Sequence, residues 1–572
     1  MRISLIIFIS LLLFACREED KTTESFDVTI HLNRDPGQIN PFYATTSLGR
    51  EVYQYIFTPL ADFHPDDLEL SPILVESLPE SIDTMILGES LVYYDINLKD
   101  DAKWSDGKPL CAQDYFFTVQ MIKHPLSEIS AWKPYFAPMK KLEMSRTDST
   151  ALRVYFDADY MLSREVALTT FVMPAHIYDP EGVLTLDGRA LISESYEIQD
   201  SAEIKVVENT NASVNAKTDV VQLGPYTLTD FQTDEYIILT AKEDYWGADH
   251  SDNVFLQQNP QRIIFRIVPD ELSAINMAKD GGLDFIRFRS SKRFLELKED
   301  SVFSAKWGFY TSQIMQYYYL AMNNQTGPLS DKLVRKAMSH LADVDDYIDN
   351  IDRGLGTRTI GHFNPTKSYY NNELEPISYD PEKAKSLLDQ AGWKDDDGDG
   401  IREKKNGNVV NKLKLDFYIT GSELSQKIAL LFQEAAKSVG VEINIVAKNM
   451  SLIRRENLSN FNFDFAALAK GTDAAPDDPY SMWHSDNAIP GTANSSGYAN
   501  PEADRYIELI RNTRLSSVRK EAYLKFQELI YEDQPVIFLY SPLQKMIINS
   551  RLQAKTTAKR PGYLANSFDL AK

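Results

Sequence analysis

The chain has 572 residues, of which 43% are hydrophobic, so it is long enough to bury about three or four domain-sized cores. Its 60 basic and 83 acidic residues give a formal charge of −23, which argues against nucleic acid and anionic membrane surfaces as partners. The only cysteines are Cys16 and Cys111, and this excludes a CxxC metal or redox motif.

The N-terminus has the features of an export signal. Arg2 precedes an apolar run over residues 3–14, which is shorter than the roughly 20 residues that a membrane-spanning helix needs. We predict a signal peptide at residues 1–15, with an uncleaved membrane anchor as the alternative. Leu-x-Ala-Cys resembles a bacterial lipobox, which would make Cys16 the lipidated first residue. Residues 16–25 are polar and predict a flexible tether, so we expect a periplasmic or cell-surface lipoprotein that meets the membrane only through its lipid.

Residues 91–122 combine a strand, a turn and a helix. Apolar and polar side chains alternate over residues 94–98, the period of two that is typical of a half-buried strand. An aromatic residue and an Asp-Gly pair at 104–109 predict a turn, and residues 114–122 carry apolar side chains at helical spacing. Cys111 stands at the expected N-cap, which cysteine fills poorly, and we interpret it as a small packed residue.

The second half of the chain contains a strand, helix, strand pattern. Residues 413–419 and 441–445 alternate as strands, and residues 428–439 carry apolar side chains at helical spacing. This order predicts a βαβ crossover and therefore a parallel pair in a covered sheet. Two further helices are predicted, one capped by Ser330 and one that begins at Asp380-Pro381.

Together these strings resemble the family 5 extracellular solute-binding proteins, the oligopeptide and dipeptide receptors of ABC importers. The resemblance covers the chain from around residue 27 to around residue 540, and it rests on the order and spacing of several motifs. These are D-P-G-Q-I-N-P at 35–41, W-S-D-G-K-P-L at 104–110, L-G-P-Y-T-L at 223–228, Y-W-G at 245–247 and the two helices near 330 and 380. The family usually has Thr or Ser where Cys111 stands.

The resemblance implies an α/β, two-lobed periplasmic-binding-protein-like fold of the class II or cluster C type, with a ligand cleft between the lobes and an extra domain in the first half. We place lobe I at residues 26–50, 165–264 and 535–572. The extra domain takes residues 51–164, and lobe II takes residues 265–534. The resemblance also implies an ABC permease and ATPase complex as partner, a small solute as ligand, and a monomer.

The predicted ligand-binding segment is the run from residue 465 to residue 483. Peptide-binding relatives have an Asp four residues before the proline of a G-W-x-x-D-x-x-D-P string, where it pairs with the terminal ammonium of the ligand. Aligned on Gly471, this chain has Thr472 in place of the Trp and Ala475 in place of the Asp. Asp473 is either a substitute anchor or a solvated loop carboxylate, and Trp483 is either a cleft wall or part of the lobe packing.

No catalytic or cofactor motif is found in the sequence. The eight histidines form no HExxH pair, and there is no GxSxG elbow and no Walker A loop. Asp395, Asp397, Asp399 and Gly400 resemble the start of an EF-hand loop, but the twelfth position is Asn406 rather than the bidentate Glu that calcium needs. We therefore expect no catalytic site, no cofactor and no metal.

These patterns favour an extracytoplasmic solute-binding lipoprotein that delivers oligopeptide-like solutes to an ABC transporter by closing its lobes on the ligand. Within the same fold, the alternative is a receptor for another solute, such as an oligosaccharide or a metal chelate. From other classes, the alternatives are a surface hydrolase and a structural lipoprotein that has lost transport. The sequence motivates neither of these two by any motif.

Overall fold

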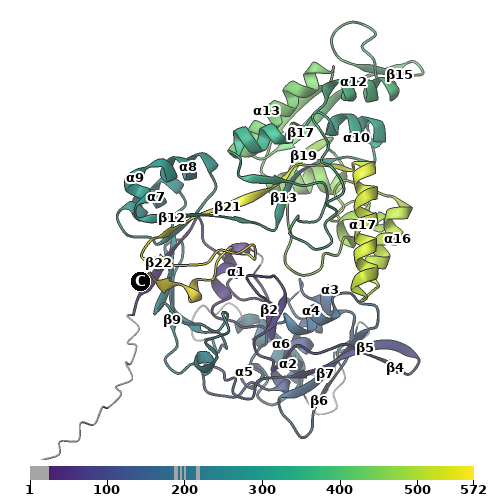
Figure 1. Cartoon of the computed structure of the whole chain (residues 1–572). Coiled ribbons are helices and arrows are strands. Elements are labelled where there is room, and N and C mark those ends of the chain that lie inside the picture. Colours follow the sequence, from purple (N-terminus) through teal and green to yellow (C-terminus); the bar gives the residue numbers. More distant parts are fainter. Residues whose placement is uncertain are drawn as a thin grey trace, which may run out of the picture.

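The computed structural model describes residues 25–44, 46–129, 131–185, 191–193, 196–198, 201–213 and 220–571. The predicted signal peptide, the predicted lipidation site Cys16 and all but the last residue of the tether lie outside these described residues. Within them, helices and strands alternate in mixed order around three main sheets (Figure 1). No helix of the described part is long and apolar enough to cross a membrane.

The first sheet joins strands from both ends of the chain. Strand β1 (Asp27–Leu32) runs parallel to β10 (Arg262–Ile267) and to β11 (Phe285–Phe288), and its inward side chains Val28 and Ile30 are fully buried. The described strands follow the order β12 (Trp307–Gln313), β21 (Tyr540–Asn549), β11, β1, β10, β9 (Tyr236–Ala241) and β8 (Tyr226–Gln232), with β14 (Gly356–Arg358) also pairing with β21.

The second sheet contains the predicted βαβ unit. Strands β17 (Lys414–Ile419) and β18 (Glu442–Ala447) are parallel and are joined by helix α13 (Glu423–Ser438), so the predicted crossover is confirmed. The described strands follow the order β18, β17, β19 (Phe465–Gly471), β13 (Gln316–Met322) and β20 (Val536–Phe538).

Helices α10 (Lys332–Ser339) and α12 (Pro381–Gln390) lie beside this second sheet and match the two helices that we predicted. Asp380 caps α12, because its side chain accepts a hydrogen bond from the backbone N–H of Lys383 at 2.9 Å. The predicted cap of α10 was wrong by one residue. Asp331 caps this helix, and Ser330 belongs to the short 3₁₀ turn that precedes it.

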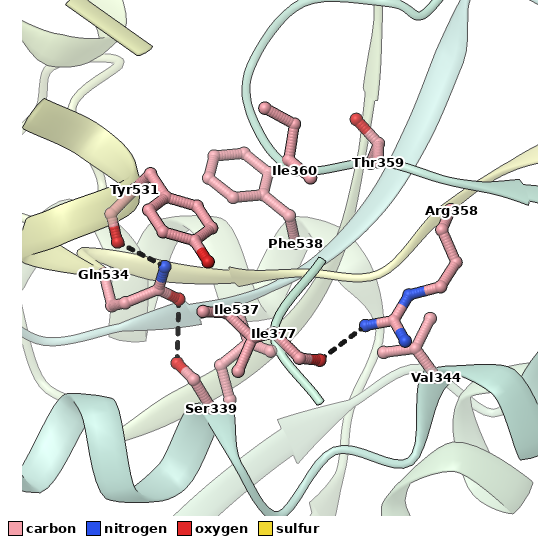
Figure 2. A pocket seen from close by; sticks show the side chains of 10 residues that line it. All are labelled: Ser339, Val344, Arg358, Thr359, Ile360, Ile377, Tyr531, Gln534, Ile537 and Phe538. Carbon is pink, nitrogen blue, oxygen red and sulfur yellow. Dashed lines mark hydrogen bonds between the residues drawn. The ribbon is translucent and has the colours of Figure 1, made fainter. Parts of the chain in front are cut away.

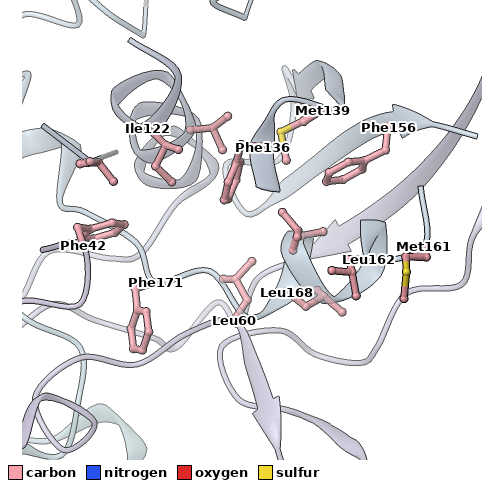
Figure 3. Packing of buried hydrophobic residues seen from close by; sticks show 14 of the residues in the cluster. Phe42, Leu60, Ile122, Phe136, Met139, Phe156, Met161, Leu162, Leu168 and Phe171 are labelled. Atoms are coloured by element: carbon pink, nitrogen blue, oxygen red, sulfur yellow. The ribbon is translucent and has the colours of Figure 1, made fainter. Parts of the chain in front are cut away.

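The third sheet belongs to the first half of the chain and has the described order β4 (Ile82–Ile86), β5 (Glu89–Asn97), β7 (Ala151–Asp157) and β6 (Met139–Met144). The predicted strand and helix are confirmed as β5 and α2 (Ala112–Lys123). Figure 3 shows how large apolar side chains of this region, among them Ile122, Phe136 and Phe156, fill the space between the helices and the sheet.

A buried carboxylate explains the turn between β5 and α2. Asp114 accepts hydrogen bonds from Trp104 Nε1 at 3.1 Å, from the Cys111 backbone N–H at 3.0 Å and from the Ala175 N–H at 2.8 Å. Cys111 is at the N-cap of α2, as predicted. Burial, with the charge of Asp114 adding to it, raises the pKa of the Cys111 thiol to about 11, so the thiol is a poor nucleophile near neutral pH.

Two short connections join the first and second sheets in the described part of the chain, which also returns to the first sheet at β14, between β13 and β17. One connection leads from β12 to β13 through residues 314–315, and the other leads from β20 to β21 through Leu539. The first sheet thus contains β11 and β12, whose residues fall in the range 265–534 that we predicted for lobe II. The division into lobes stays a prediction, and the two short connections are where we expect a hinge between the sheets.

Candidate functional site

The predicted ligand-binding segment begins at the edge of the second sheet, next to one of the two connections. Gly471 is the last residue of β19 and pairs with Gln316, the first residue of β13. The backbone N–H of Thr472 then donates to the Met315 carbonyl at 2.9 Å. These bonds hold the start of the loop against residues 314–315, where the chain leaves the first sheet.

Arg560, in the C-terminal segment that follows the first sheet, reaches this same edge. Its Nη2 donates to the Met315 carbonyl at 3.0 Å and to Gln316 Oε1 at 3.2 Å. A Cβ atom at position 471 would lie 2.8 Å from that nitrogen, so glycine lets the guanidinium pack here without shifting. Burial lowers the pKa of Arg560, and the negative charge of Asp473 opposes this shift.

A second arginine comes from helix α1 (Ser47–Tyr53), close to the N-terminal strand of the first sheet. The half-buried side chain of Arg50 forms no hydrogen bond and no ion pair with any other described residue. Burial works against its charge, but the negative charges of Asp62 and Asp473 hold the pKa of Arg50 above its ordinary value. The adjacent Glu51 by contrast has partners: its Oε1 lies 2.7 Å from Arg287 Nη2 and accepts a hydrogen bond from the Tyr563 hydroxyl.

The negative charge of Asp473 acts on both of these arginines. Its side chain is exposed, and Oδ1 accepts a hydrogen bond from the Ala475 N–H at 3.1 Å, which closes a turn in the loop. Its charge also acts on Tyr135 of helix α3 (Lys133–Phe136), where burial and then Asp473 raise the pKa of the phenol. Asp473 therefore lies among groups from three separate regions of the chain.

The rest of the loop is held by Lys367 and Tyr369, which belong to the same half of the chain. Lys367 Nζ donates to the carbonyls of Ala474 at 3.1 Å and Ala475 at 2.6 Å. Asp477 Oδ2 accepts from the Tyr369 hydroxyl at 2.7 Å; burial raises the pKa of Asp477, and Lys367 opposes the shift. Apart from the turn that Asp473 Oδ1 closes, the loop is thus held in place by interactions of other side chains.

Trp483 ends the short helix α15 (Tyr480–Trp483) and is fully buried. Its ring centroid lies 5.6 Å from that of His362 and 6.2 Å from that of Phe538, inside the hydrophobic core. Trp483 is therefore packed in the core, as the lobe-packing interpretation of this residue expects.

A nearby pocket is too small to hold a solute. Figure 2 shows its lining, which includes Arg358, Ile360, Gln534 and Phe538. The volume open to water is about 20 Å³, enough for about one water molecule. None of the residues predicted to bind a ligand lines it.

Sequence reasoning missed Arg50 and Arg560. The chain contains 60 basic residues, and neither arginine belongs to a motif that would single it out. Their role becomes visible only when folding brings α1, the C-terminal segment and the loop after β19 together.

The chain is similar to known bacterial solute-binding proteins along its length. The family model described as "Bacterial extracellular solute-binding proteins, family 5 Middle" matches residues 89–490. The Oligopeptide-binding protein AppA of Bacillus subtilis is 26% identical over 597 residues, which cover 100% of this chain and 98% of AppA.

Solved structures agree on the fold. AppA of Bacillus subtilis in complex with a nonapeptide superposes with a TM-score of 0.71 at 22% identity, covering 96% of this chain and 100% of that one. NikA from Brucella suis in complex with Fe(III)-EDTA gives 0.74 at 19% identity, covering 95% and 100%. The predicted two-lobed α/β fold is confirmed by these matches.

Proposed function

Because the chain belongs to the bacterial extracellular solute-binding proteins of family 5, we propose that it binds an oligopeptide-like solute outside the cytoplasm and presents it to an ABC importer. The family consists of binding proteins, so the chain is not an enzyme. Peptide is the preferred solute because AppA, which the chain matches over its full length, is named for oligopeptide binding and holds a nonapeptide in its structure. We further propose that the protein acts as a monomer and docks on a permease and ATPase complex.

The position of Arg560 at the start of the loop, together with the charge of Asp473 acting on both Arg560 and Arg50, is the observation that carries the proposed site. We assign Asp473 to the ammonium end of the solute and Arg50 to a carboxylate or main-chain carbonyl. An ion pair in a dry cleft selects strongly, since either charge left unpaired would cost several kcal/mol. Gly471 and Thr472 offer backbone and hydroxyl groups, and the Thr472 Oγ1 is buried without a partner among the described atoms.

We propose smaller roles in solute binding for Ala475 and Trp483. Ala475 contributes through its backbone, which Lys367 holds. Trp483 supports the loop from the core rather than touching the solute.

A metal chelate remains the second candidate solute. NikA, which has the same fold, is in complex with Fe(III)-EDTA, and the nickel-binding periplasmic protein of Escherichia coli is also among the relatives. Arg50 and Arg560 offer two guanidinium groups at the proposed site, which suits a polycarboxylate. Titration calorimetry with peptides and with Fe(III)-EDTA separates the two candidates.

We expect saturating peptide to reduce the radius of gyration of the protein, because contacts from both sides of a cleft favour the closed state. Small-angle X-ray scattering across a peptide titration checks this result, and the change should follow occupancy measured by calorimetry. A fully occupied protein of unchanged dimensions would contradict the closure mechanism.

We also propose that Cys16 carries a lipid that anchors the protein to the membrane. Palmitate fed to the native host should label the wild type and fail to label the Cys16→Ala variant. Cys111→Ala is the matched control, since it removes the other cysteine and should keep the label. Equal labelling of the wild type and Cys16→Ala would refute the lipid anchor while leaving solute binding untouched.

A further inference from the structure

The loop between α12 and the hairpin of β15 (Glu403–Asn406) and β16 (Val409–Lys412) gathers carboxylates at the end of the molecule beside α12 (Figure 1). Asp395 accepts hydrogen bonds from the N–H groups of Gly398 at 2.8 Å and Gly400 at 3.1 Å. The backbone of Gly400 has a φ of +87°, which suits the sharp turn that an EF-hand loop makes at its sixth position. Acidic turns of this kind are common without an ion, so the loop alone decides nothing.

Glu403 supplies the observation that points to a ligand. Its side chain is only 4% exposed, and Oε1 accepts from the N–H groups of Asp396 at 3.0 Å and Asp397 at 3.1 Å. Its other oxygen, Oε2, is buried and has no hydrogen-bond partner among the described residues. A buried carboxylate oxygen without a donor is costly, and a cation removes that cost.

The spacing of the carboxylates fits one ion. Oxygen atoms of Asp395, Asp397 and Glu403 all lie within 4.8 Å of one another. Oxygens bound to Ca²⁺ at about 2.3–2.6 Å stand at most about 5 Å apart across the ion, so small side-chain adjustments bring all three onto it. Carboxylate ligands without His or Cys select a hard cation rather than zinc or copper.

We propose that Asp395, Asp397 and Glu403 bind a Ca²⁺ ion, with backbone oxygens and water completing its coordination. Glu403, the ninth residue of the loop, would supply the glutamate ligand that an EF-hand loop has at its twelfth residue, which is Asn406 in this chain. Ca²⁺ is preferred to Mg²⁺ because Mg²⁺ demands near-ideal octahedral geometry and gives up its water reluctantly. The ion would fasten the loop to β15, in a place separate from the proposed solute site.

Lys412 allows a second test of the proposal, in which a substitution should strengthen calcium binding instead of weakening it. Its Nζ lies 3.0 Å from Asp397 Oδ2 and also contacts the Asp399 carboxylate. This ammonium neutralises part of the charge that an ion would meet, so it competes with Ca²⁺ for Asp397. Removing the lysine charge should strengthen calcium binding, which a purely structural cluster of carboxylates does not predict.

The experiment is calorimetric titration of the full protein, stripped with EDTA and dialysed, with CaCl₂ and separately with MgCl₂. We expect a dissociation constant for Ca²⁺ of about 10⁻⁴–10⁻³ M, the range of extracellular calcium modules. Glu403→Gln and Asp395→Asn should weaken binding at least tenfold, and Lys412→Gln should tighten it severalfold. Asp396→Asn is the matched control and should bind as the wild type, because Asp396 pairs with Lys405 outside the cluster.

The wild-type titration decides the proposal even if a variant fails to fold. No heat of binding and no rise in the thermal midpoint up to about 10 mM CaCl₂, ten times the weak end of the range, would overturn it. Equal affinity for Mg²⁺ would overturn the assignment to calcium, and unchanged binding by Glu403→Gln would overturn the role of Glu403.

Discussion

We expect the Asp473→Asn variant to bind a free pentapeptide about 2–5 kcal/mol more weakly than the wild type, because closure on the solute would bury the exposed Asp473 in a charge pair and this is the range for truncating one partner of such a pair. Lys367 and Tyr369 fix the loop, and asparagine keeps the Oδ1 that accepts from the Ala475 N–H, so the substitution should leave the loop in place. Titration calorimetry measures the change. N-acetylation of the peptide should weaken binding to the wild type by a similar amount, and should add nothing in the variant.

The matched control for this prediction is Asp486→Asn, whose carboxylate is 73% exposed and follows α15. This variant should bind the free pentapeptide as the wild type does. If Asp473→Asn is neutral and free and acetylated peptides bind alike, the solute amine is not recognised. In that case Ala475→Asp, which restores the relatives' pattern, should create a preference for the free amine; its failure would show that the loop is misaligned.

Local elements were predictable because their signals are local. The alternation over residues 94–98 and the turn at 104–109 specify β5 and α2, and Trp104 and Asp114 contact each other ten residues apart. The cap of α10 was missed by one residue for an equally local reason. Ser330 and Asp331 are adjacent capping residues, and a preceding 3₁₀ turn incorporates the first of them.

The candidate site was only partly predictable, because its charges come from distant parts of the chain. The segment containing Asp473 was found through the resemblance of its sequence to relatives. Arg50 and Arg560 are separated by almost the whole chain, and periodicity reports only which face of an element is buried. Glu403 was missed because an EF-hand loop places its last ligand at the twelfth residue. In this chain the first strand of the hairpin brings the ninth residue, Glu403, back against the loop.

Loss of the Arg335 side chain should strongly destabilise the protein. It is 7% exposed, in α10, and its guanidinium donates to the main-chain carbonyls of Leu329 at 3.1 Å, Ser330 at 3.0 Å, Asp533 at 3.0 Å and Gln534 at 3.2 Å. Burial lowers the pKa of Arg335, and the charge of Asp533 opposes this shift. The side chain thereby ties α10 to the end of α17 (Ser516–Asp533), just before β20 leads to the connection between the sheets.

Arg335→Met should lower the thermal midpoint strongly and destabilise the protein by about 3–5 kcal/mol, because each buried carbonyl left without a donor costs about 1–3 kcal/mol. Calorimetry and urea titration measure the loss. The matched control is Lys336→Met on the same helix, where Nζ pairs with Glu532 at 2.6 Å but the side chain is 28% exposed. Partly exposed pairs contribute about 1 kcal/mol or less, so equal losses in the two variants would show that the Arg335 network is not a structural tie.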